Sequence, residues 1–208
     1  PNACDPLFER WAANGQLTEQ RRWQRTKLAV ESGNYGLANF LIKGMPTLGE
    51  RGKLMVEVAQ KPQLLKNTAR FAPADDAMSD VVGLGLRRLA RQNPEDALAL
   101  LDGYAQRMKF SSDEQVAIAR QIGLRLAQRF DLRGLQVMAK YDPQLRDNTV
   151  SEWRARLLLR HGRWEEAYQL TQKMPSDLAS SNRWRYWNAR SLQLAQPNSL
   201  SLIHISEP

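Results

Sequence analysis

The chain has very few of the residues that bind metals or form disulfides. It contains one cysteine, Cys4, and two histidines, His161 and His204. A lone cysteine cannot form an internal disulfide, and these three residues are too few for a convincing metal site. We therefore expect no metal and no cofactor. Cys4 is either a free thiol or half of a bridge to a residue outside this chain, and His161, just before Gly162, is interpreted as a residue of a helix C-terminus.

Long apolar runs and the short motifs of catalysis are also missing. No stretch of about 18 apolar residues exists, so no membrane-spanning helix is expected, and no basic segment followed by an apolar one opens the chain. No phosphate-binding loop, HExxH, CxxC or GxSxG motif occurs. Gly83 and Gly85 lack the third glycine and the preceding strand of a dinucleotide site.

Two pairs of adjacent carboxylates, at 75–76 and 165–166, do not form an acid–base dyad. Neighbouring residues on a helix point about 100° apart. Each pair is expected in the first turn of a helix, where negative charge favours the helix dipole. The residues alone therefore predict no catalytic site.

What the chain has in excess is positive charge. Thirty lysines and arginines against 22 acidic residues give a formal charge of +8. Such a surface favours anionic partners, namely nucleic acid, anionic lipid or an anionic cell-wall polymer, although a solvated helical surface without a ligand accounts for the charge equally well. The basic residues are spread along expected helices, for example Arg87, Arg88, Arg91, Arg120, Arg125 and Arg129.

Almost every segment has the pattern of a helix, and strand signals are nearly absent. N-cap residues, prolines in first turns and glycines at helix ends predict helices at 6–13, 18–32, 34–42, 48–60, 62–71, 73–91, from 94, 113–129, 131–141, 150–160, 163–174 and 182–195. The expected N-caps include Thr18, Ser111 or Ser112, Asp131, and Asn148 or Thr149.

Two segments repeat one another without a gap. Residues 31–46 read ESGNYGLANFLIKGMP and residues 160–175 read RHGRWEEAYQLTQKMP. Both contain a glycine, an aromatic residue, then Ala, Leu and Met at helical spacing, before a final Met-Pro. A second echo, Trp-x-Ala-Arg, begins at Trp153 and again at Trp187. Such repeats, with turns at uneven intervals, predict an all-α fold, an irregular α-solenoid of stacked helical hairpins.

Aromatic residues gather at the expected hairpin boundaries. Exposed aromatic rings are common in sugar-binding sites, but a tryptophan at helical spacing beside Leu and Ala is more often a packing residue. We predict packing for all eight: Trp11, Trp23, Tyr35, Trp153, Trp164, Trp184, Tyr186 and Trp187.

Three stretches resemble the N-terminal superhelical region of the soluble lytic murein transglycosylases. They are PNACDPLFERWAANGQ at the start, RTKLAVESGNYGLANFL at 25–41 and SNRWRYWNARSLQLAQ at 181–196, the last being the most specific. The resemblance implies a U-shaped helical domain of a periplasmic enzyme. That enzyme cleaves the MurNAc–GlcNAc bond of peptidoglycan, leaves 1,6-anhydromuramic ends and needs no metal. Its chemistry lies in a separate C-terminal lysozyme-like domain.

The family's catalytic glutamate lies in a Glu-Ser-x-Phe/Tyr motif. Glu31 and Ser32 match its first two residues, but Tyr35 comes one place too late, and the repeat puts Arg160 and His161 at the same positions. We therefore carry over no catalytic residue and expect the chain alone to be inactive. The resemblance also implies that Cys4 pairs with a cysteine slightly upstream.

We expect residues 1–197 to form part of the U-shaped helical domain. Residues 198–208 have neither helical period nor cap, so we expect a disordered, non-native-looking tail. The expected partner is peptidoglycan, with no specific nucleic acid and a monomeric chain that is prone to aggregate, because solenoid ends need polar caps. The alternative is a non-enzymatic, tetratricopeptide-like module that binds a protein.

Overall fold

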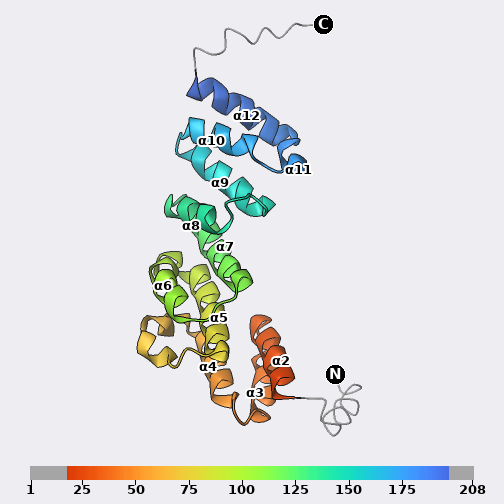
Figure 1. Ribbon diagram of the computed structural model, residues 1–208, viewed down its shortest axis with the longest axis vertical. Coiled ribbons are helices and arrows are strands. Elements are labelled where there is room, and N and C mark those ends of the chain that lie inside the picture. Colours follow the sequence, from red (N-terminus) through yellow and green to blue (C-terminus); the bar gives the residue numbers. More distant parts are fainter. Residues whose placement is uncertain (1–17, 197–208) are drawn as a thin grey trace. The chain divides into compact units, whose positions relative to one another are not determined.

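The computed structural model describes residues 18–196, and every regular element in this range is a helix (Figure 1). The α-helices are α2 (Glu19–Glu31), α3 (Tyr35–Lys43), α4 (Gly49–Gln60), α5 (Asp76–Gln92), α6 (Pro94–Arg107), α7 (Ser112–Gln128), α8 (Arg133–Tyr141), α9 (Asn148–Arg160), α10 (Trp164–Gln172), α11 (Ser176–Ala179) and α12 (Asn182–Ala195). The all-α prediction is confirmed for this part of the chain. The helix expected at 6–13 and the tail expected at 198–208 lie outside the described residues.

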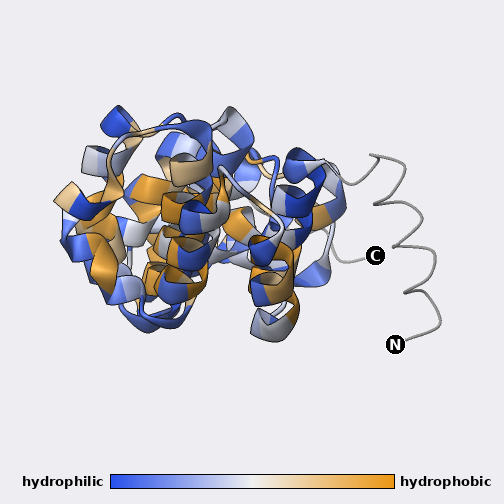
Figure 2. Ribbon diagram, turned by 90° about the horizontal axis from the view of Figure 1, so that it is seen from below, coloured by the Kyte–Doolittle hydropathy of each residue, from blue (hydrophilic) through white to orange (hydrophobic). Residues whose placement is uncertain are grey.

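The chain divides into two compact units between Ile118 and Ala119, inside α7. In the first unit, α3 packs between α2 and α4, and α5 packs between α4 and α6. In the second unit, α9 contacts α8 and α10, and α12 contacts α10 and α11. Helices therefore pack mainly on their neighbours in sequence, as hairpin repeats do. They carry hydrophobic residues on some faces and hydrophilic residues on others (Figure 2).

The two repeated segments form equivalent hairpins. Each turn contains a glycine in the left-handed region, with φ of 79° at Gly33 and 67° at Gly162. After each glycine, the next N–H donates to the carbonyl five positions earlier, at N···O distances of 2.8 and 3.0 Å. The sequence predicted these turns because glycine adopts positive φ without steric cost and commonly ends helices.

The repeated apolar residues occupy the same core positions in both hairpins. Ala38 and Ala167 are both fully buried. The leucines and methionines that follow them are also buried; they are Leu41, Met45, Leu170 and Met174. The aromatic residues of the repeat, Tyr35 and Trp164, are half-buried. The repeat is thus a structural unit in which one packing solution is used twice.

Some helix starts differ from the prediction. Thr18 and Ser111 accept a backbone N–H three residues on, as expected. Helix α9, however, is capped by Asp147, whose carboxylate accepts from the Val150 N–H at 3.1 Å, and not by Asn148 or Thr149. Asp131 precedes the N-cap of α8 and forms a turn by accepting from the N–H two residues on.

The segment expected as one helix at 62–71 is instead two 3-10 helices, η2 (Pro62–Lys66) and η3 (Thr68–Phe71). Helix α11 was not predicted. None of the helices within 18–196 has both the length and the apolar character to cross a membrane.

Candidate functional site

The apparent catalytic motif has structural partners. Glu31 is the last residue of α2, and Arg87 of α5 donates to its carboxylate at 2.8 Å. Ser32 is the C-cap of α2, and its hydroxyl donates to the Ala29 carbonyl at 3.0 Å. Both side chains therefore hold the end of α2 in place.

Glu31 belongs to a charged cluster around a small cavity of about 110 Å³ in the first unit. Asp80 accepts from Lys27 at 2.5 Å and from the Trp23 indole N–H at 2.7 Å. The Arg87 guanidinium lies between Glu31 and Glu114, with its Nε 3.6 Å from the Glu114 carboxylate. Among these residues each carboxylate has a cation as neighbour, so the cluster joins α2, α5 and α7 electrostatically.

Glu114 is the least satisfied member of this cluster. Its Oε1 is buried and has no hydrogen-bond partner. Burial raises the pKa of this carboxyl, and the positive charges of Arg87 and Lys27 oppose the rise without cancelling it. A carboxyl with a raised pKa is a feature of catalytic acids, but structural ion-pair clusters produce it as well.

The other residues that the sequence analysis weighed as site candidates have structural roles or lie outside the described residues. Gly85 packs where a Cβ would overlap Val58 and Leu65 of the first unit, so its role is close packing within α5. The carboxylate pairs lie at the starts of α5 and α10, as predicted. No group of histidines, cysteines and carboxylates within 18–196 could hold a metal ion. Cys4 and His204 lie outside the described residues.

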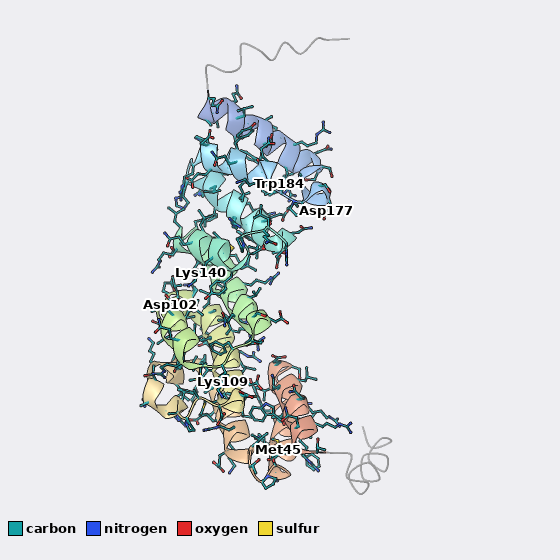
Figure 3. The ribbon with its side chains drawn as sticks, viewed as in Figure 1. Met45, Asp102, Lys109, Lys140, Asp177 and Trp184 are labelled. Atoms are coloured by element: carbon teal, nitrogen blue, oxygen red, sulfur yellow. The ribbon has the colours of Figure 1, made fainter. Side chains whose placement is uncertain are left out.

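A wider hollow of about 400 Å³ lies in the second unit, and we call it the aromatic groove. Its wall is formed by aromatic rings and arginines of α9, α12 and the turn after α7, including Phe130, Trp153, Trp187, Arg156, Arg160 and Arg183. Trp184 also lines it; this residue lies on α12 (Figure 3), is only 2% exposed, and donates its indole N–H to Glu152 at 3.1 Å.

The arginines of the groove lie against its rings. The Arg156 guanidinium is 5.1 Å from the centroid of the Trp153 ring, and the Arg160 guanidinium is 5.1 Å from that of Phe130. Such cation–π contacts hold the planar guanidinium groups beside the aromatic faces. Arg156 is also ion-paired with Glu152 at 3.1 Å, whereas Arg160 contacts the Phe130 ring and forms no ion pair with any described residue.

His161 supports one edge of the groove. Its Nε2 lies 2.8 Å from the carbonyl oxygen of Phe130, which has a φ of 59°. His161 is the C-cap residue of α9, in the helix-end position that the sequence predicted. Its ring contacts the turn after α7, a long-range partner that sequence reasoning missed.

The packing prediction for the aromatic residues is correct only in part. Trp23 and Trp184 are buried, and Tyr35, Trp153, Trp164 and Trp187 are half-buried. Tyr186 is 60% exposed, so that prediction is wrong, although its ring packs edge-on against Trp187, with centroids 5.3 Å apart. Trp11 lies outside the described residues. In the sequence, the signal related to the groove is the Trp-x-Ala-Arg echo, because its two tryptophans, Trp153 and Trp187, both line the groove.

Comparison with known proteins shows similarity to lytic transglycosylases. No protein-family model matches it. The soluble lytic murein transglycosylase of Escherichia coli K12 is 27% identical over 192 residues, which are 91% of this chain and 30% of that protein. The X-ray structure of an inactive mutant of the lytic transglycosylase Slt of Pseudomonas aeruginosa is 64% identical, with a TM-score of 0.92 over 97% of this chain and 33% of that one. The 70-kDa soluble lytic transglycosylase of Escherichia coli shares the fold, with a TM-score of 0.71.

Hairpins that pack on their sequence neighbours and reuse the same core positions define an α-helical repeat protein, an irregular α-solenoid. The fold class predicted from the sequence is confirmed. The chain is homologous to the N-terminal helical part of the soluble lytic transglycosylases. It spans about a third of the length of these relatives.

Proposed function

We propose that this chain is part of the helical scaffold of a periplasmic lytic transglycosylase that acts on peptidoglycan. The observation that carries the proposal is the 64% identity to Slt of Pseudomonas aeruginosa over nearly the whole chain, with a TM-score of 0.92. The scaffold would occupy residues 1–197, and its partner would be the anionic glycan strand, in keeping with the formal charge of +8.

The chain by itself would not cleave peptidoglycan. Lytic cleavage of a glycosidic bond needs an acid that can transfer its proton to the leaving oxygen. Glu31 has Arg87 as a direct hydrogen-bond donor, and Glu114 lies in the same ion-paired cluster. These contacts support structural roles for both carboxylates, and no cofactor is invoked.

The first experiment incubates the purified chain with purified sacculi and measures soluble 1,6-anhydromuropeptides by liquid chromatography and mass spectrometry. We expect no release above the buffer control, while a full-length lytic transglycosylase releases them under the same conditions. Release by the chain would contradict its inactivity. Release that is lost in Glu31→Gln would also overturn the structural role of Glu31.

A further inference from the structure

We propose that the aromatic groove of the second unit is a binding site for a glycan that carries carboxylates. The sugar rings would pack on Phe130, Trp153 and Trp187, and a carboxylate would bind Arg160. This inference rests on the proposed function, because it takes the acidic glycan of the cell wall as the ligand. It adds a site that the scaffold proposal alone does not contain.

The shape and lining of the groove favour a sugar. Four of its eight lining residues are aromatic, and the groove is not closed over, since Phe130 is 47% exposed and Trp153 and Trp187 are half-buried. An aromatic ring presents an apolar face that matches the C–H face of a pyranose ring. Ligand sites commonly combine such apolar walls with a few placed polar groups.

The charge of the groove favours an acidic ligand. Arg156, Arg160 and Arg183 contribute three positive charges, and Glu152 is the only carboxylate that pairs with any of them among the described residues. The guanidinium of Arg160 is therefore available for a bidentate contact with a ligand carboxylate, which is the geometry that arginine favours. Positions 153, 156 and 160 share one face of α9, so the rings and the charges point into the same space.

The first copy of the repeat supports a role in binding for Arg160. The residue at the same place in that hairpin is Glu31, which is ion-paired with Arg87 at 2.8 Å. There, the end of the hairpin is fastened by an ion pair within the unit. Arg160 has no such pair with a described residue, although the two hairpins share their turn and their core. The ion pair of the first hairpin thus has no counterpart among the described residues of the second, where Arg160 contacts the Phe130 ring instead.

The test measures binding of the 208-residue chain to soluble, peptide-free glycan strands that alternate GlcNAc and MurNAc. Isothermal titration calorimetry gives the affinity, and chitotetraose, which has N-acetylated rings without carboxylates, is the neutral control ligand. We expect the acidic strands to bind more tightly than chitotetraose. Arg160→Glu should weaken binding of the acidic strands about tenfold or more, and Trp187→Ala by a similar factor.

The control variant is Arg185→Ala, which removes an exposed arginine of α12 that does not line the groove and should leave the affinity unchanged. Circular dichroism melting of each variant separates lost binding from lost folding. No measurable binding by the wild type, equal binding of chitotetraose, full affinity in Arg160→Glu, or displacement by a short RNA would each overturn the proposal. None of these results bears on product release from sacculi, which tests the scaffold proposal separately.

Discussion

The glycine of each repeated turn is required by the backbone and not by packing. Gly33 has a φ of 79°, and a Cβ built on it would meet no atom within 4 Å. A side chain would fit in space but would strain a left-handed backbone, which L-residues with a Cβ adopt at a cost. Gly103 of α6 offers a matched case, because its Cβ would also meet nothing and its backbone is helical.

Alanine at these two glycines should therefore change stability in opposite directions. We expect Gly33→Ala to lower the free energy of unfolding by about 1 kcal/mol. Gly103→Ala should raise it by about 0.5–1 kcal/mol, because alanine is the better residue in an exposed helix. Urea denaturation followed by circular dichroism measures both, and a stabilised Gly33→Ala variant would show that the turn tolerates a Cβ.

Single residues also mark the limit of prediction from sequence. The core positions Ala38 and Ala167 followed from helical spacing within one segment. The environment of Arg160 did not, because its ring partner Phe130 lies in a turn 30 residues earlier and is brought near only by packing of α7, α8 and α9. For the same reason Tyr186, with the same local pattern as its packed neighbours, could not be distinguished as exposed.

Helices were predictable as elements because their starts and ends are encoded locally. One exception is the start of α9, where three residues with capping side chains follow one another at 147–149. All three residue types are favoured at the N-cap, so the local sequence does not identify which of them caps the helix. Asp147 is selected by a distant group, since Arg120 of α7 forms a hydrogen-bonded ion pair with its carboxylate. A tertiary contact thus fixes the helix boundary.

Asp147 and Glu114 should give opposite pH-dependent effects on stability. Burial raises the pKa of Asp147, but hydrogen bonds from Arg120 and from the Val150 N–H outweigh burial and lower it below 3.8. Its stabilising effect is therefore present above pH 3.8 and is lost as the pH falls through the lowered value. Burial raises the pKa of Glu114 above 4.5, so its ionised form destabilises the fold increasingly as the pH rises through the raised value.

Charge-neutral variants should separate the two effects. Asp147→Asn keeps a capping side chain and should lose about 1 kcal/mol of stability throughout pH 5 to 8. Glu114→Gln should be more stable than the wild type at pH 8, and this gain should shrink as the pH falls toward 4.5. Urea unfolding at a series of pH values measures both. A Glu114→Gln variant that is less stable at pH 8 would mean that attraction to Arg87 exceeds the cost of burying the carboxylate.

For the whole molecule, a formal charge of +8 does not identify the class of ligand that the chain binds. Several arginines that the sequence suggested as a binding surface are used inside their own unit. Arg88 donates to the carbonyls of Val30 and Glu31 at 2.9 Å, and Arg120 holds Asp147. The number of basic residues therefore overstates how many are available to a ligand, and charge alone left nucleic acid, anionic lipid and cell wall as alternatives.

Salt dependence should distinguish a nucleic-acid partner from a cell-wall partner. Binding of RNA without a dedicated site is almost entirely electrostatic, so it should be lost when NaCl rises from about 50 mM to about 500 mM. Binding to sacculi should weaken with salt but persist at the higher concentration, because apolar contacts in the aromatic groove are not screened. A pulldown with sacculi and with a short single-stranded RNA, performed at both salt concentrations, measures this.

The Trp187→Ala variant should lose the salt-resistant fraction of sacculus binding, while Arg185→Ala should keep it. RNA binding that survives high salt better than sacculus binding would instead favour a nucleic-acid partner and would contradict the assignment of the groove to a cell-wall glycan.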